Sequence, residues 1–167
     1  YNPAGKLPVT FYRNVSQLPD FEDYNMTGRT YRYMQDVPLF PFGYGLSYTT
    51  FGYGKTVLDK NELTAGQSLK LTVPVTNTGK CNGEEVVQVY LRKQGDAEGP
   101  IKTLRAFKRV SIPAGKTVNV EFDLKDKELE WWDDQSNTVR VCPGNYDIMV
   151  GGSSKEEDLQ RTTIAIK

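Results

Sequence analysis

The stretch SLKLTVPVTN, residues Ser68–Asn77, places Leu69, Leu71, Val73 and Val75 at every second position. Successive side chains of a β-strand point to opposite faces, so this alternation predicts a strand with one apolar face. A single strand can bury neither that face nor its backbone hydrogen-bonding groups. The stretch therefore predicts a sheet built with partner strands from elsewhere in the chain.

Outward from this stretch, six further segments have strand-like composition or the same alternation. They are Gly52–Asp59, Glu84–Lys93, Thr103–Ile112, Lys116–Leu124, Asn145–Gly151 and Leu159–Ile166. Turn-forming sequences such as NTGKCNG, IPAGK, CPGN and GGSS separate several of them. No segment shows helical periodicity over a useful length. Short strands with turns between them predict an all-β fold, an antiparallel β-sandwich of about seven strands.

One connection in this scheme is long. Lys125–Pro143 contains LEWWDD and is expected to hold an extra hairpin or a helical turn. Tyr146 follows it at the start of the next strand, where a tyrosine corner would direct its hydroxyl to nearby backbone. An ordinary inward-facing tyrosine is the alternative.

The first 50 residues differ from the rest. Lys6–Phe11 (KLPVTF) predicts one short strand, which would need a sheet supplied by residues that precede this chain. PLFPFGYGLSYTTF, the aromatic segment Pro38–Phe51, holds five aromatic rings, two prolines and two glycines without a charge. Such an irregular apolar stretch is suited to lie between domains, where a charge would be desolvated without a partner.

Composition excludes several functions. The 167 residues carry 21 basic and 21 acidic side chains and no histidine. Zero net charge argues against general binding to nucleic acid or to an anionic membrane. Without histidine, Ser-His and Cys-His triads and most zinc sites are excluded. The sequence does not begin with Met, and we expect it to be part of a longer chain.

Paired carboxylates are the tools of glycoside hydrolysis, so each acidic cluster is a candidate. Neighbours in a strand point to opposite faces, which prevents Glu84 and Glu85 from converging. The other clusters lie in predicted loops, and solvated surface is the expected role of all of them. The clusters are Asp20, Glu22 and Asp23; Glu84 and Glu85; Asp133 and Asp134; and Glu156, Glu157 and Asp158.

Trp131 and Trp132 leave two interpretations open. They could form a platform on which the apolar face of a sugar stacks. Alternatively, one ring closes the open end of the sandwich while the other packs against a neighbouring surface.

Several motifs occur in an order that carries a family resemblance. They are NPAGKLPVTF, GRTYRY, PLFPFGYGLSYTTF, VTNTG, GEEVVQVYL, LRAFKRVSIPAGKTVNVEFDL and CPGNYDIMVGGSS. Together they cover nearly the whole chain and resemble the C-terminal end of family 3 glycoside hydrolases, of the β-glucosidase and β-xylosidase type. The resemblance implies that residues 1–24 are the last edge of an α/β sandwich domain. It implies that residues 25–48 are an interdomain connector and residues 49–167 a fibronectin type III-like domain.

In that family both catalytic motifs lie in domains upstream of such a region. The resemblance therefore implies no catalytic residue, cofactor or metal ligand here. It implies a non-catalytic domain that serves stability and interdomain packing, with a carbohydrate-binding module using Trp131 or Trp132 as the alternative. The side chains expected in interdomain packing are Phe40, Phe42, Tyr44, Leu46 and Phe51.

The expected partners are the upstream catalytic domains of the same polypeptide and, when the chain is alone, a second copy of it. No nucleic acid or membrane is expected as a partner. The family resemblance also suggests export to the periplasm or the medium.

The two cysteines are not expected to bond to each other. Cys81 falls in the turn after Ser68–Asn77, and Cys142 falls just before Asn145–Gly151. In a seven-stranded sandwich these connections lie at opposite ends, about 26 Å apart. A disulfide needs Cα atoms within about 7 Å.

Overall fold

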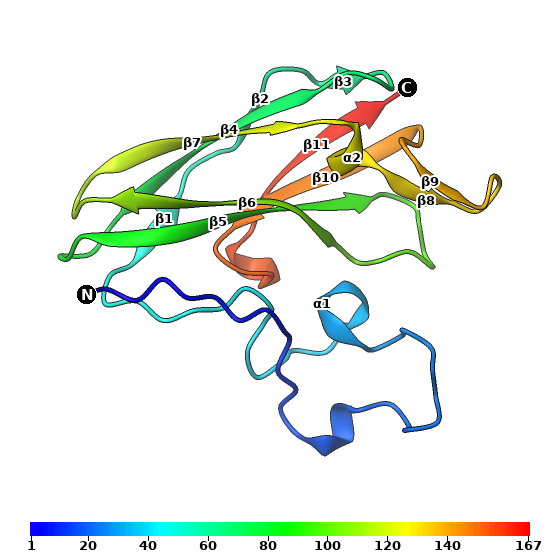
Figure 1. Cartoon of the computed structure of the whole chain (residues 1–167), viewed down its shortest axis with the longest axis horizontal. Coiled ribbons are helices and arrows are strands. Elements are labelled where there is room, and N and C mark those ends of the chain that lie inside the picture. Colours follow the sequence, from blue (N-terminus) through cyan, green and yellow to red (C-terminus); the bar gives the residue numbers. More distant parts are fainter.

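Two sheets face each other across an apolar core in the computed structural model, which describes residues 1–167 (Figure 1). In the first sheet, β4 (Leu69–Asn77) is the central strand. The short strands β1 (Phe51–Tyr53) and β2 (Val57–Leu58) both pair with it antiparallel. β7 (Thr117–Leu124) pairs antiparallel with β4 over eight residues.

The second sheet has five strands in the order β3-β11-β10-β5-β6. β5, β10 and β11 form its antiparallel centre, with β6 antiparallel at one edge. β3 is parallel to β11 at the other edge. Their bounds are β3 (Glu62–Leu63), β5 (Gly83–Lys93), β6 (Thr103–Ile112), β10 (Gly144–Gly151) and β11 (Gln160–Ile166). The all-β sandwich predicted from the alternation is thereby confirmed.

The first predicted strand, Gly52–Asp59, is divided into β1 and β2. The Gly54 N–H donates to the carbonyl of Pro74 in β4, so that residue's backbone faces the β1–β2 edge. Proline has no N–H to donate there, and the pairing stops until Val57. A proline in the partner strand thus explains why one strand became two.

The long connection between β7 and β10 holds both of the features expected for it. A helical turn, α2 (Asp126–Leu129), is followed by the hairpin of β8 (Trp131–Asp133) and β9 (Thr138–Arg140). A 3₁₀ turn, η2 (Glu156–Asp158), connects β10 to β11.

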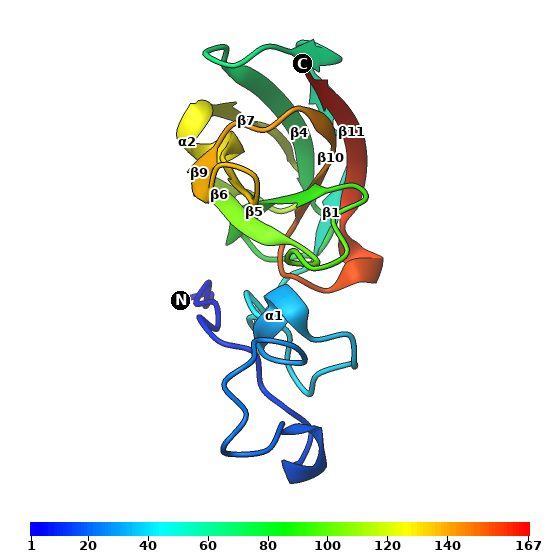
Figure 2. The same cartoon turned by 90° about the vertical axis from the view of Figure 1, so that its right-hand side faces the viewer.

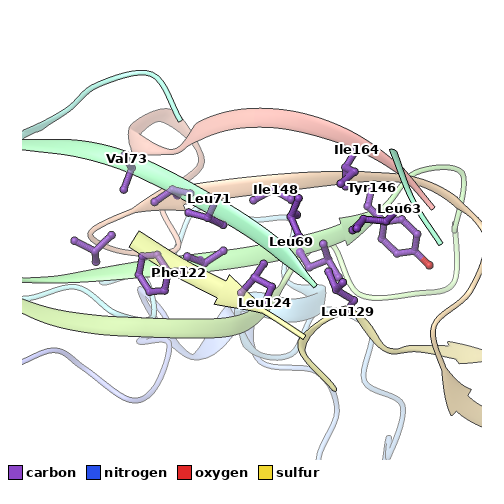
Figure 3. Close-up of a cluster of buried hydrophobic side chains, with 14 of the residues drawn as sticks. Leu63, Leu69, Leu71, Val73, Phe122, Leu124, Leu129, Tyr146, Ile148 and Ile164 are labelled. Atoms are coloured by element: carbon purple, nitrogen blue, oxygen red, sulfur yellow. The ribbon is translucent and has the colours of Figure 1, made fainter. Parts of the chain in front are cut away.

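The core lies between the sheets, where alternate residues of facing strands meet (Figure 3). Leu69 and Leu71 of the first sheet face Ile148 and Ile164 of the second. The Tyr146 hydroxyl donates to the carbonyl of Cys142 at 2.9 Å, which is the backbone contact expected of a tyrosine corner. Burial raises the pKa of this hydroxyl.

Both cysteines are free, as expected. Cys81 is exposed in the turn between β4 and β5, whereas Cys142 is buried in the core.

Residues 1–48 lie against one side of the sandwich and add no strand to it (Figures 1 and 2). They contain the 3₁₀ turn η1 (Val15–Gln17) and one short helix, α1 (Thr30–Tyr33). No helix in the chain has the length and apolar character needed to cross a membrane.

Within this chain Lys6–Phe11 forms no strand, and its pairing with a sheet supplied by preceding residues stays a prediction. The segment instead makes one isolated bridge, Phe11 to Phe40, and hydrogen bonds between Leu7 and residues 43–44. The facing chain contains Pro38 and Pro41, which have no N–H, and Gly43 with φ of 78°. These residues interrupt a ladder before it can extend.

Candidate interdomain interface

The aromatic segment is fixed to the sandwich by a buried side chain of β5. The Gln88 Nε2 amide donates to the carbonyls of Gly43, at 3.2 Å, and Gly152, at 2.6 Å. The Gln88 Oε1 atom accepts a hydrogen bond from the Tyr90 hydroxyl at 2.5 Å. One amide therefore joins the aromatic segment, β5 and the loop after β10. We call this set of contacts the Gln88 clamp.

Gly43 fits the clamp because it has no side chain. Its φ of 78° lies in the left-handed region, and a Cβ there would overlap the Gln88 amide. The neighbouring Phe42 carbonyl accepts from the Ser154 N–H at 2.9 Å, which adds a second backbone link. The glycine in PFGYG is thus required by both conformation and space.

Stacked rings continue the contact. Tyr31 of α1 stacks on Phe42, with ring centroids 4.3 Å apart, and meets the edge of Tyr90 at 5.9 Å. The Tyr31 hydroxyl accepts from the Leu104 N–H at 3.1 Å. α1 is therefore held to β5 and β6 by both ring packing and a hydrogen bond.

A buried ion pair lies on the same side of the sandwich. The Lys6 ammonium contacts the Glu85 carboxylate at 2.7 Å, and both side chains are largely buried. Burial, followed by the charge of Glu85, raises the pKa of the nearby Tyr53 hydroxyl. The N-terminal segment thus supplies the cation that compensates a carboxylate on β5.

A second group of charged side chains lies at η2, the turn between β10 and β11. Lys102, almost fully buried, binds Glu156 at 2.5 Å, and Glu156 also contacts Arg161. Burial raises the pKa of Glu156, but the hydrogen bond and charge of Lys102 and the charge of Arg161 outweigh it and leave the pKa below its usual value.

These contacts explain a burial pattern that alternation did not predict. β5 is buried on both faces from Val87 to Leu91, because residues of the N-terminal segment cover its outer face. Gln88 and Tyr90, on the face expected to be solvated, are 3% and 0% exposed. The apolar neighbours of Gln88 and Tyr90 were a signal, but a glutamine is also common on solvated strand faces.

The residues expected in interdomain packing divide into two groups. Phe42, Tyr44 and Phe51 are half-buried, and Phe51 packs on the sandwich core. Phe40 and Leu46 remain exposed, at 39% and 70%. The first group packs within this chain, whereas the second leaves apolar surface free.

That free surface extends over the N-terminal segment. Thirteen of the seventeen exposed large apolar side chains precede Thr49. They are Tyr1, Val9, Phe11, Val15, Leu18, Phe21, Tyr24, Met26, Val37, Leu39, Phe40, Leu46 and Tyr48. We call this set the apolar N-terminal surface.

The two tryptophans differ in exposure. Trp131 is 2% exposed in the core, where its Nε1 donates to Asp96 at 2.6 Å and its ring contacts Tyr146. Trp132 is 49% exposed, and its Nε1 donates to Asp134 at 2.8 Å. Only Trp132 offers an accessible ring face.

Most of the candidate acidic side chains form ion pairs with neighbouring basic side chains or accept hydrogen bonds in local turns. Glu84 contacts Arg109, whereas its neighbour Glu85 contacts Lys6. Asp133 binds Arg140 at 2.6 Å across the β8–β9 hairpin. Asp20 and Asp23 accept backbone hydrogen bonds in local turns.

Comparison with known proteins adds two family matches. Residues 85–154 match the fibronectin type III-like domain, and residues 1–48 match the glycosyl hydrolase family 3 C-terminal domain. The first match lies within the sandwich, and the second covers the N-terminal segment.

Similar proteins cover nearly all of this chain. A xylan 1,4-β-xylosidase of Xylanibacter ruminicola is 52% identical over 99% of the chain, which spans 19% of that protein. A periplasmic β-glucosidase of Salmonella typhimurium is 35% identical over 92% of the chain and 22% of its own length. The chain thus spans about a fifth of these curated relatives.

A solved β-glucosidase structure from Erythrobacter marinus superimposes with a TM-score of 0.82 at 39% identity, over 99% of this chain and 22% of that one. The sandwich, the docked N-terminal segment and these matches agree. The chain therefore resembles the C-terminal region of family 3 glycoside hydrolases of the β-glucosidase and β-xylosidase type: its N-terminal segment matches that family's C-terminal domain, and its sandwich matches a fibronectin type III-like domain.

Proposed function

We propose that this chain is the non-catalytic C-terminal part of a β-glycosidase and that it stabilises the enzyme by packing against its catalytic domains. The apolar N-terminal surface is the observation that carries the proposal. Monomeric proteins rarely leave large apolar patches in water, and such patches mark interaction sites. The relatives are about five times longer than this chain, so a longer enzyme of this kind would hold further domains that could cover this surface within one polypeptide.

The proposed domain boundaries follow the same division. Residues 1–24 complete an upstream domain, residues 25–48 connect, and residues 49–167 form the sandwich. The Gln88 clamp and the Tyr31 stack hold the connector to the sandwich. A rigid connector transmits the position of one domain to the other, which a flexible linker could not do.

The parent enzyme is proposed to release terminal β-D-glycosyl residues from β-xylosides or β-glucosides. The names of the relatives support these substrates, and the name of one supports export to the periplasm. The 167-residue chain should give no turnover of aryl β-xyloside or aryl β-glucoside. Turnover that disappears on mutation of one of its own carboxylates would contradict the proposal.

The proposed packing against the catalytic domains is tested with matched substitutions that introduce a charge, made both in the longer enzyme and in this chain. Leu46→Asp should lower the unfolding temperature of the longer enzyme, because a charge would be buried without a partner. The same change should have little effect in the 167-residue chain, where Leu46 is 70% exposed. Phe107→Asp, at a 68% exposed site on β6, is the control expected to be neutral in both.

Equal effects of Leu46→Asp and Phe107→Asp in the longer enzyme would contradict the packing role. In the isolated chain, the uncovered surface is expected to pair with a second copy. Sedimentation of the unmodified 167-residue chain and of its Leu46→Asp variant measures this association, which the added charge should weaken.

A further inference from the structure

A cavity of about 180 Å³ lies where α1 meets the β8–β9 hairpin. Arg32 and Tyr33 of α1 line one part of it, and Trp131 and Trp132 of β8 line another. Arg105 of β6 also contributes to the lining. The cavity therefore forms only when the N-terminal segment is docked on the sandwich.

The lining holds hydrogen-bond donors without partners. The Nε atoms of Arg32 and Arg105 are both buried and make no hydrogen bond. Neither guanidinium takes part in an ion pair, and the one hydrogen bond that the two groups make runs from Arg105 Nη2 to the carbonyl of Glu130, at 2.6 Å. Burial, and then the charge of Arg32, lowers the pKa of Arg105. The Nε atoms themselves are out of reach of a ligand, but both side chains are only partly buried, so their terminal N–H groups favour a ligand that accepts hydrogen bonds.

Acceptors line the same cavity. Asp96, Glu98 and Asp134 contribute carboxylates, and none of them forms an ion pair with a basic side chain. Asp96 and Asp134 each accept from an indole N–H, which leaves further lone pairs. Donors and acceptors of opposite charge thus share one small space without pairing to each other.

This combination selects a class of ligand. A free anion would meet three carboxylates, and a free cation would meet two guanidinium groups. A neutral molecule with several hydroxyls can donate to the carboxylates and accept from the arginines. The half-exposed ring of Trp132 adds an apolar face, against which the C–H face of a sugar ring can lie.

We propose that this cavity is a binding subsite for one neutral sugar ring of a glycan. Trp132 stacks on the ring, Arg32 and Arg105 donate to its oxygens, and Asp96 and Asp134 accept from its hydroxyls. The choice of β-1,4-linked probes rests on the proposed function of the parent enzyme, whereas the site rests on the cavity itself.

Titration of the 167-residue chain with xylohexaose and with cellohexaose, followed by tryptophan fluorescence and calorimetry, tests the subsite. We expect saturable binding of at least one probe. Trp132→Ala should weaken it about tenfold or more, and Trp132→Phe should restore part of it, because the stacking face returns. Arg32→Gln should also weaken binding, since it removes the charged donor from α1.

Tyr48→Ala is the matched control, because Tyr48 is an aromatic side chain that is 77% exposed and lies outside the cavity lining. It should leave the affinity unchanged. Thermal melts of each variant check that the sandwich remains folded. Trp132 is half exposed, so its loss should not unfold the chain.

Absence of binding to either probe would overturn the subsite, and so would binding that Trp132→Ala leaves unchanged. Tighter binding of glucuronate or glucosamine than of the neutral sugars would overturn the neutral class. None of these results bears on interdomain packing, which the charge insertions in the longer enzyme test separately.

Discussion

Residues 1–48 and residues 49–167 are ordered by different means. Every buried apolar side chain of the core lies between Leu63 and Ile166, whereas Gly43 is the one fully buried residue of the N-terminal segment. The sandwich is held by apolar burial between two sheets. The N-terminal segment is held to the sandwich by hydrogen bonds, ring stacking and one ion pair. The comparison shows how a segment can be ordered without a core of its own.

The largest difference between the regions should appear on truncation of apolar side chains. Leu71→Ala in the core should lower the free energy of unfolding by about 2–5 kcal/mol, through lost burial and a cavity. Phe21→Ala, at a site 94% exposed, should change it by about 0.5 kcal/mol or less. Urea denaturation of the 167-residue chain measures both. A cost at Phe21 that matches the cost at Leu71 would mean that the N-terminal segment has a core after all.

Substitution of one glycine should release the N-terminal segment from the sandwich. Gly43→Ala forces an alanine to φ of 78° and into the Gln88 amide, at a cost of about 2–4 kcal/mol. We expect residues 1–48 to become sensitive to protease while the sandwich remains folded. Limited proteolysis with mass spectrometry measures the cleavage sites.

Gly28→Ala is the matched control for this change. Gly28 has a similar φ of 73°, but no atom lies within 4 Å of a Cβ added there. The substitution should cost only the conformational strain, about 1 kcal/mol, and should leave the segment docked. If both variants released residues 1–48 equally, strain alone and not the Gln88 clamp would explain the effect.

The two regions also differ in how far sequence could predict them. Alternation from Leu69 to Val75 predicts a strand because burial on one face imposes a period of two. Lys6–Phe11 forms only one bridge within this chain because the segment that faces it contains two prolines and a left-handed glycine, whereas its pairing with a sheet from preceding residues stays a prediction. The local sequence pattern predicts a strand well when the strand buries one face in the core. It predicts less well a segment that is ordered by contacts with residues distant in sequence.

The same limit applies to the interface. The aromatic segment was identified from its composition, but its partners Gln88 and Tyr90 were not, because a polar residue between valines normally faces water. The exposure of Trp132 and the burial of Trp131 also depend on the hairpin register, in which Trp131 faces Arg140 and Trp132 faces Val139. Two adjacent tryptophans in a sequence do not show which ring will be buried.

The smallest expected effect concerns the β8–β9 hairpin, which belongs to the sandwich by sequence but has the exposed character of the N-terminal segment. Hydrogen bonds from Ser136 and Arg140, with the charge of Arg140, lower the pKa of Asp133 to about 2. The folded-state pKa lies below the ordinary value of 3.8. The charged carboxylate therefore stabilises the fold above the unfolded pKa, and this contribution is lost as pH falls from about 4 towards about 2.

Asp133→Asn should therefore be slightly less stable than the parent chain at pH 7, and the difference should fade as the pH approaches 2. The effect should be small and should shrink in high salt, because the pair is exposed and screened. Thermal melts of both proteins between pH 2 and pH 7, at low and high salt, measure it. Asp123→Asn, at an exposed site on β7 that forms no ion pair, is the control expected to show no such difference. A gap between Asp133→Asn and the parent that persisted unchanged at pH 2 would show that hydrogen-bond geometry, and not the charge of Asp133, holds the hairpin.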